Sequence, residues 1–352
     1  MDQSPIINLK DIESTYSGAR YEPLYLKSIN LTVNAGEALA IIGRNDSGKS
    51  ALLRCIGLME RPLTGIVSID QKNLTFMASK ELCNERRSIG LISSKADFLA
   101  SKTVSKNIAL PLKIQGVESE RINVLVSQVL TKVDLENVKD SLTTNLTQLQ
   151  RIQLDLARNL VNNLRILLCD DIFAGLDQRS TETLIALLKS IKQEYSLTII
   201  LTTNDAEVIK SLCNNVIVMQ HGFIVEKCSV LELFTQPKSD LSKDFIRFNT
   251  KHELPWCLRR KIVPQETENY HAIVRINFSE CLAPEEILSN TLHAYELQMN
   301  IVQAYQEAIQ DKMINVMLIE IFGDNSIVND AIAFLTNNGL KSEIIGYAPN
   351  IN

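Results

Sequence analysis

The residues with the clearest chemical meaning form a glycine-rich stretch, Gly-Arg-Asn-Asp-Ser-Gly-Lys-Ser, at positions 43–50. A G-x-x-x-x-G-K-S loop presents backbone N–H groups to the phosphates of a nucleotide. Lysine in this pattern reaches the β and γ phosphates, and the following serine hydroxyl ligates Mg²⁺. The pattern therefore predicts a site for a nucleoside triphosphate and Mg²⁺. Its predicted binding residues are Gly43, Arg44, Asn45, Asp46, Ser47, Gly48, Lys49 and Ser50.

The segments on either side of this loop have the patterns that such a loop needs. An apolar run at 37–43 is typical of a buried strand, and residues 49–59 carry apolar side chains at helical spacing. A strand that turns through glycine into a helix directs N–H groups and a helix N-terminus at one point, which suits an anion. This setting favours a nucleotide loop over a chance occurrence of the pattern.

A second motif supplies carboxylates. The stretch Arg-Ile-Leu-Leu-Cys-Asp-Asp at 165–171 is typical of a buried strand that ends in acid. Asp170, at the carboxyl end of that strand, can hold the water shell of Mg²⁺. Asp171 follows where a water-orienting base would stand. The alternative is a structural strand with a capping aspartate, but the phosphate loop earlier in the chain favours the metal role.

Length and composition narrow the class of protein. The chain has 352 residues, enough for two or three domains, with 45% hydrophobic and 22% charged residues. A net charge of −5 argues against nucleic acid as a main partner, because phosphate backbones require a basic surface. No apolar run is long enough to span a bilayer, and the first thirty residues lack the pattern of a secretion signal.

The order of strand-like and helix-like segments predicts two domains. Buried apolar strands alternate with helices from about residue 6 to residue 226, which predicts an α/β domain with a mostly parallel sheet covered on both faces. The strand at 65–70 is one of these segments. The pattern breaks where polar residues and two prolines gather. We expect a first domain at 1–240, a linker at 241–268 and a second domain at 269–352.

The second domain has the order β-α-β-β-α-β, which predicts a small α+β unit of ferredoxin-like topology. The hairpin between its second and third strands is expected to turn at Gln310 and Asp311. The expected strands and helices are 271–278, 284–295, 300–310, 312–323, 326–338 and 340–347.

The order of these motifs resembles the ATPase domain of ABC transporters, a P-loop NTPase fold. The match includes the phosphate loop, the strand ending at Asp170 and the stretch Ala-Gly-Leu-Asp at 174–177. A closer resemblance, to the ATP-binding subunits of methionine importers, rests on the segments at 89–92, 103–112 and 316–323. The terminal unit resembles the regulatory domain of those subunits.

This resemblance implies a translocase subunit that binds ATP and Mg²⁺ and dimerises, as a homodimer or heterodimer, head to tail around two ATP molecules. It further implies an integral membrane permease subunit docked near residues 94–111, and a peripheral location on the cytoplasmic face of the inner membrane. Methionine would bind the terminal domain as an inhibitory effector.

Two single residues are assigned by the same resemblance. Tyr16 falls where the family stacks an aromatic ring on adenine, although a tyrosine at a strand edge is an equally simple interpretation and Tyr21 or Tyr25 could take that place. Asn300 matches a residue of the family's methionine site. An asparagine that opens a strand can also be only a turn former.

The chain departs from the family pattern at residues that act during hydrolysis. Ser94 stands where a glutamine senses Mg²⁺ and water, and Asn204 replaces the switch histidine. Gln148 and Leu149 replace the two glycines of the signature sequence, which let N–H groups approach the partner's γ-phosphate. Asp171 replaces the general-base glutamate and is one methylene shorter.

These departures leave two hypotheses. The first is the ATP-binding, energy-coupling subunit of an amino-acid importer, with Asp171, Asn204 and Ser94 in the catalytic positions. The second is a hydrolysis-deficient nucleotide-binding partner or sensor that pairs with an intact ABC ATPase. The nucleotide-holding residues fit both. Asp46 also replaces a loop glycine, and its charge would face the phosphates, although aspartate tolerates left-handed backbone angles better than most residues.

Overall fold

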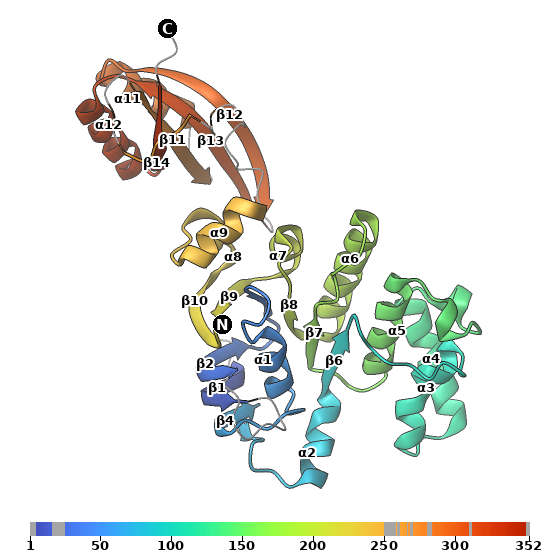
Figure 1. Cartoon of the computed structure of the whole chain (residues 1–352). Coiled ribbons are helices and arrows are strands. Elements are labelled where there is room, and N and C mark those ends of the chain that lie inside the picture. The colour runs from blue at the N-terminus through green and yellow to red at the C-terminus, as the bar shows by residue number, and fades with distance from the viewer. Residues whose placement is uncertain are drawn as a thin grey trace. The chain divides into compact units, whose positions relative to one another are not determined.

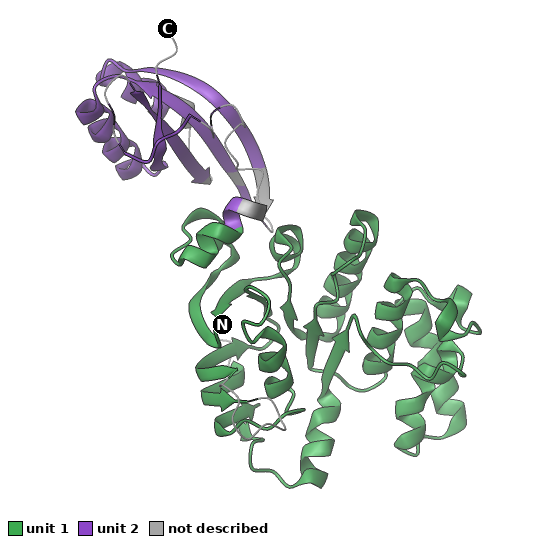
Figure 2. Ribbon diagram, in the orientation of Figure 1, with its two compact units in different colours: residues 1–245 green, residues 246–352 purple. Residues whose placement is uncertain are grey.

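The computed structural model describes residues 5–15, 25–249, 258, 261–265, 267, 270–279, 284–309 and 312–349. The chain forms two compact units, residues 1–245 and 246–352, shown in separate colours in Figure 2. Helix α9 (Asp240–Asn249) occupies the start of the segment expected to be a linker. Most of residues 250–269 lie outside the described residues, so the limits of that linker stay a prediction.

A six-stranded sheet forms the centre of the first unit, in the order β10-β9-β3-β8-β7-β6. Its pairs are parallel except that of β10 with β9. Strands β3, β7 and β8 are almost entirely buried, as parallel strands covered on both faces must be. The strands are β3 (Ala38–Ile42), β6 (Ile89–Ser93), β7 (Ile166–Asp170), β8 (Thr198–Thr202), β9 (Asn215–Gln220) and β10 (Phe223–Ser229).

A second, antiparallel sheet in the same unit has the order β2-β1-β4-β5. The strand expected at 65–70 is β4 of this sheet, so its expected place in the parallel sheet is wrong. Burial alternates along β2, which is typical of an antiparallel strand with one covered face, and this signal distinguishes the two sheets. The strands are β1 (Pro5–Ser14), β2 (Leu26–Asn34), β4 (Thr64–Ile69) and β5 (Lys72–Asn73).

Helix α1 (Lys49–Ile56) lies between the two sheets. Its Leu52 and Leu53 belong to one core cluster with Leu9 of β1 and Leu168 of β7. Burial of that core fixes where α1 begins, and so it fixes the phosphate loop that precedes the helix. Helices α3, α4 and α5 pack against one another, and α5 contacts β6 (Figure 1). The other helices of this unit are α2 (Ser79–Glu85), α3 (Val104–Ile114), α4 (Ser119–Lys132), α5 (Gln148–Leu160), α6 (Gln178–Tyr195), α7 (Ala206–Leu212) and α8 (Val230–Thr235).

The second unit has the β-α-β-β-α-β order that the sequence predicts. Its antiparallel sheet has the strand order β12-β13-β11-β14, and both helices share a core with one face of that sheet. The turn predicted at Gln310 and Asp311 lies outside the described residues. The elements are β11 (Tyr270–Ser279), α11 (Pro284–Ala294), β12 (Gln298–Ile309), β13 (Lys312–Phe322), α12 (Asn325–Asn337) and β14 (Lys341–Pro349).

Candidate nucleotide-binding site

The loop at 43–50 connects β3 to α1 through two glycines that no other residue can replace without strain. Gly43 and Gly48 have φ angles of 152° and 102°. A Cβ atom at Gly43 would lie 2.4 Å from the carbonyl oxygen of Met219, and one at Gly48 would lie 2.8 Å from that of Tyr25. Asp46 has a φ of 63°, a left-handed conformation that aspartate tolerates better than most residues.

Lys49, the first residue of α1, folds back over the loop. Its Nζ donates to the carbonyl oxygens of Gly43 at 2.7 Å and Arg44 at 2.9 Å. Burial lowers the pKa of the Lys49 ammonium, while the nearby carboxylates of Asp171, Asp170 and Asp46 act in the opposite direction. The loop therefore holds its cation at the point where the chain turns into the helix.

Ser50 and Asp170 bring two oxygen ligands together. The Ser50 hydroxyl donates to Asp170 Oδ1 at 2.9 Å, although 120 residues separate them in sequence. Hydroxyl and carboxylate oxygens are the ligands that Mg²⁺ prefers. The residues present at the end of β7 and the start of α1 thus fit a magnesium ion beside the phosphate loop.

Asn204 and Asp171, two of the residues expected to act in hydrolysis, reach the same place. Asn204 accepts the N–H of Gly43 at 3.3 Å through Oδ1 and donates to the Gly43 carbonyl oxygen at 3.2 Å through Nδ2. Asp171 is exposed and has a φ of 53°, directly after β7. Both therefore border the loop, and their roles in hydrolysis stay predictions.

Ser94 follows β6 and donates its N–H to the carbonyl oxygen of Asp170 at 3.5 Å. The segment after Ser94 is held on helix α5. Arg151 donates to the carbonyl oxygen of Ala96 at 3.2 Å, Arg158 to that of Asp97 at 2.8 Å, and both guanidinium groups lie near the Phe98 ring. These contacts tie the segment that follows Ser94 to α5.

The residues in the place of the signature sequence begin α5. Thr147 and Gln150 form a capping box at its N-terminus. Gln148 donates through Nε2 to the carbonyl oxygen of Ala174 at 2.6 Å, which ties it to the stretch at 174–177 of its own chain. Leu149 is half-buried. Among the described residues, no hydrogen bond joins Gln148 or Leu149 to the phosphate loop.

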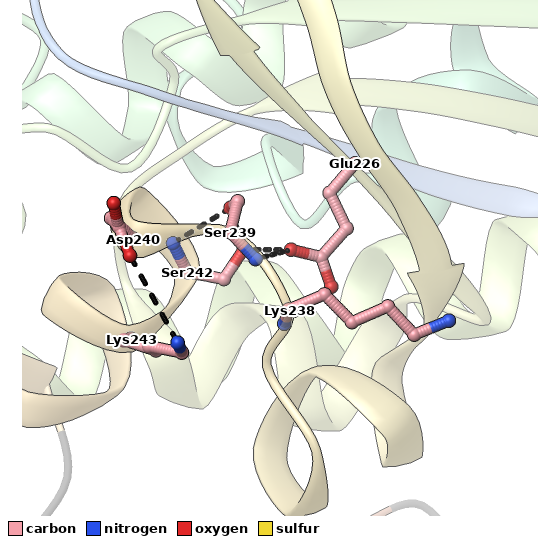
Figure 3. Close-up of polar contacts among 6 residues, drawn as sticks. All are labelled: Glu226, Lys238, Ser239, Asp240, Ser242 and Lys243. Atoms are coloured by element: carbon pink, nitrogen blue, oxygen red, sulfur yellow. Dashed lines mark hydrogen bonds and ion pairs between the residues drawn. The ribbon is translucent and has the colours of Figure 1, made fainter.

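Arg44 of the loop pairs with Asp244 of α9 at 3.4 Å. Helix α9 is held in turn by Glu226 of β10. The Glu226 carboxylate accepts the N–H groups of Lys238 at 3.1 Å and Ser239 at 2.7 Å, and the Ser242 hydroxyl at 2.6 Å (Figure 3). Burial alone would raise the pKa of Glu226, but these hydrogen bonds outweigh it and lower the pKa.

The two single residues that the resemblance assigned are Tyr16 and Asn300. Tyr16 and its alternative Tyr21 fall outside the described residues. Asn300 lies in the second unit, where its Nδ2 donates to Glu320 at 2.9 Å. Glu320 also pairs with His271 at 3.4 Å. Both Glu320 and His271 are buried, on the sheet face opposite α11 and α12.

Sequence reasoning missed two residues that contact the predicted site. Thr202 at the end of β8 donates to Asp170 Oδ1 at 3.0 Å and accepts the N–H of Asp171 at 2.8 Å. The one sequence signal that could have indicated Thr202 is a hydroxyl side chain at the end of the apolar strand that pairs with the strand of Asp170. No sequence pattern could have indicated Asp244, because its pairing with Arg44 depends on the position of α9.

Two family models match the chain: the ABC transporter model over residues 26–174 and the NIL domain model over residues 272–344. In solved structures, the first unit resembles the ATP-binding cassette MJ0796 in a dimeric post-hydrolysis state bound to ADP and Pi, with a TM-score of 0.59 and 27% identity. That match covers 64% of this chain and 98% of MJ0796. CbiO1 of Clostridium perfringens, part of an ABC transporter complex, gives a TM-score of 0.60 at 26% identity, over 66% of this chain and 91% of that one. The predicted fold class is confirmed.

Relatives extend over almost the whole chain. It is 35% identical to the methionine import ATP-binding protein MetN of Coxiella burnetii over 97% of both chains. It is 31% identical to that of Vibrio cholerae over 97% of this chain and 99% of the relative. The likeness thus includes both units and the segment between them, and the chain belongs to the methionine import ATP-binding protein family of ABC transporters.

Proposed function

We propose that this chain is the ATP-binding, energy-coupling subunit of an amino-acid importer of the methionine type. The observation that carries this proposal is the phosphate loop, in which Lys49 folds over the loop while Ser50 meets Asp170. The names of the full-length relatives support methionine as the transported substrate. They also favour the importer subunit over a hydrolysis-deficient partner or sensor.

The phosphate loop and the residues beside it would bind ATP through backbone N–H groups, the Lys49 ammonium and the oxygen atoms of Ser50 and Asp170. The N–H groups of residues 43–50 and the Lys49 ammonium bind the phosphates, as glycine-rich loops at a helix N-terminus do. Ser50 and Asp170 would hold Mg²⁺, which neutralises the charge that develops on the transferred phosphoryl group. Asn204 fixes the backbone of Gly43 through two hydrogen bonds, and Asp171 would orient the attacking water.

The partners follow from the family and from the dimeric state of the solved relative. Two ATP-binding domains, in a homodimer or heterodimer, would close around two ATP molecules and dock on an integral membrane permease near residues 94–111. In the described residues, none of the helices is long and apolar enough to cross a bilayer. We place the subunit peripherally at the cytoplasmic face of the inner membrane, attached through its permease, and co-purification from membranes with and without the permease tests this.

Methionine, or a related amino acid, would act as effector at the second unit, near Asn300. The NIL domain match covers residues 272–344 and so includes this position. Binding there would hold the ATP-binding domains apart, so that accumulated product inhibits its own import.

Calorimetry tests the central proposal. Full-length protein titrated with Mg·ATP should show saturable binding in the micromolar to millimolar range, and Lys49→Ala should weaken it at least about tenfold, because the variant loses a charge-assisted contact worth roughly 1.5–3 kcal/mol. Lys80→Ala, on the exposed face of α2, is the matched control. A folded wild-type chain that gives no binding heat would contradict the proposal.

Slow hydrolysis is a specific expectation within this function. Ser94, Asp171 and Asn204 depart from the family pattern, and Gln148 is tied to Ala174 of its own chain. A catalytic group displaced by about 1 Å can lose on the order of 10²-fold in rate. Phosphate release by the purified chain, alone and with its permease, measures this. Rapid turnover that Lys49→Ala abolishes would exclude slow hydrolysis as a property of this subunit.

A further inference from the structure

Thr202 closes a hydrogen-bonded bridge between the two acidic residues at the end of β7. It is 2% exposed and lies opposite Asp170 in the parallel register of β7 and β8. Its Oγ1 donates to Asp170 Oδ1 at 3.0 Å and accepts the N–H of Asp171 at 2.8 Å. One buried hydroxyl therefore uses its donor and an acceptor lone pair on two consecutive residues.

The first of these bonds sets the orientation of the Asp170 carboxylate. Asp170 Oδ1 receives two hydroxyl donors, Ser50 at 2.9 Å and Thr202 at 3.0 Å, which come from α1 and β8. Donors on two sides fix the plane of the carboxylate. A metal ligand that is itself hydrogen-bonded needs no reorientation when the ion binds, and loss of such a supporting bond typically costs 10–100-fold in metal affinity.

The second bond holds the backbone of Asp171. This residue has a φ of 53°, a left-handed conformation that aspartate adopts at lower cost than most residues but less readily than glycine. The bond from its N–H to Thr202 stabilises that conformation, and the conformation decides where the Asp171 side chain leaves the backbone. Replacement of the hydroxyl by a methyl group would leave this N–H without its acceptor.

We infer that Thr202 is a positioning residue, which orients Asp170 toward the magnesium ion and Asp171 toward the attacking water. The inference rests on the proposed function, because it assumes that Mg·ATP binds beside the loop. Thr202 itself would touch neither the magnesium ion nor the attacking water. It acts through the two acidic residues, and its effect is therefore on metal affinity and turnover and not on the grip of the loop on the phosphates.

The same strand offers a matched control. Thr198, at the opposite end of β8, is also buried, at 0% exposed, and its Oγ1 accepts the N–H of Gly36 at 2.9 Å. Three residues of strand lie between the two threonines, which places them about 13 Å apart over four steps of roughly 3.3 Å. Thr198→Val thus removes a buried hydroxyl and one backbone hydrogen bond from the same strand without touching Asp170 or Asp171.

The experiment measures Mn²⁺ binding to the full chain in the presence of ATP, by electron paramagnetic resonance, and ATP binding without divalent metal, by calorimetry. We expect Thr202→Val to weaken Mn²⁺ binding about 10–100-fold and to leave metal-free ATP affinity within about twofold of wild type. Thr202→Ser, which keeps the hydroxyl, should restore Mn²⁺ affinity to within a few-fold. Thr198→Val should bind Mn²⁺ as wild type does.

Thermal unfolding of each variant shows that it is folded, and Thr202→Ala gives the same readout without a branched side chain. Unchanged Mn²⁺ affinity in Thr202→Val and Thr202→Ala would overturn the inference, as would equal losses in Thr202→Val and Thr198→Val, because a general effect of buried hydroxyls would then explain both. A wild-type chain that binds no ATP at all would instead contradict the proposed function, and that result is visible before any variant is made.

Discussion

Asp171, which we propose as the residue that orients the attacking water, has a side chain one methylene shorter than glutamate, and its backbone is left-handed with a φ of 53°. The shorter side chain displaces the carboxylate by more than 1 Å, which can cost on the order of 10²-fold in rate. Asp171→Glu should therefore raise the rate of phosphate release at least about tenfold. The left-handed backbone is present before and during turnover, so it does not by itself change the rate.

Steady-state phosphate release at saturating Mg·ATP measures this change, with Asp171→Asn as the control that removes the charge and lowers the rate. A slower Asp171→Glu variant would show that the remaining replacements, and not the missing methylene, limit hydrolysis.

Gly48 has no tolerated substitute for two separate reasons, a φ of 102° and the carbonyl oxygen of Tyr25 at 2.8 Å from an added Cβ. Gly36 shares only the first, because its φ is 73° and nothing lies within 4 Å of an added Cβ. Gly36→Ala should cost about 1 kcal/mol of unfolding free energy from backbone strain. Gly48→Ala should cost more and should also weaken ATP binding. Urea denaturation and ATP calorimetry check both variants, and equal costs would mean that the contact with Tyr25 is harmless.

Helix α5 carries a buried carboxylate whose ionisation opposes folding. Asp155 accepts the N–H of Ser93 at 3.1 Å, and burial raises its pKa to about 6, although the bond from Ser93 and the charge of Arg158 act against this. Because the folded pKa is raised, the folded state is favoured most below the unfolded pKa of about 4. That stability is lost as pH rises through about 6.

Asp155→Asn removes this charge and keeps a carbonyl acceptor for Ser93. The variant should therefore be more stable than wild type at pH 8, by on the order of 2–3 kcal/mol, and the difference should vanish near pH 4. Urea denaturation at both pH values measures it, with Asp134→Asn in the turn after α4 as control. A difference of the same size at pH 4 would exclude ionisation as its cause.

At the scale of α9, a chain of contacts connects the end of the first unit to the phosphate loop. Glu226 holds the start of α9 through three hydrogen bonds, and Asp244 of α9 pairs with Arg44. The Arg44 pair is exposed and contributes little to stability by itself. The buried carboxylate of Glu226 therefore does more to keep α9 in place than the pair with Arg44 does.

For the whole molecule, the proposed effector site gives the sharpest prediction. The Asn300 amide is bonded to the buried Glu320 carboxylate, which also pairs with His271, so a bound amino acid would meet a polar cluster on a sheet face that also carries Ile273 and Leu318. Asn300→Ala should weaken methionine binding to the full chain at least about tenfold and relieve any inhibition of ATP turnover by methionine. Asn315→Ala, in the same sheet, should leave binding unchanged. Equal methionine affinity in wild type and Asn300→Ala would remove Asn300 from the site.

The sequence by itself determined the features that depend on local pattern. The phosphate loop, the strand ending at Asp170, the helix that begins at Lys49 and the order of the second unit all follow from residue spacing over a few to about a dozen positions. Hydrophobic period and glycine geometry act over that range, so these elements were readable before any contact was known.

Tertiary structure decided the contacts that close the site. Thr202 meets Asp170 across 32 positions, Asn204 meets Gly43 across 161, and Arg44 meets Asp244 across 200. The antiparallel sheet that takes β4 out of the parallel one was missed for the same reason. Which strands pair, and which hydroxyl faces which carboxylate, is set by the burial of distant segments in one core, and no local pattern in the chain encodes it.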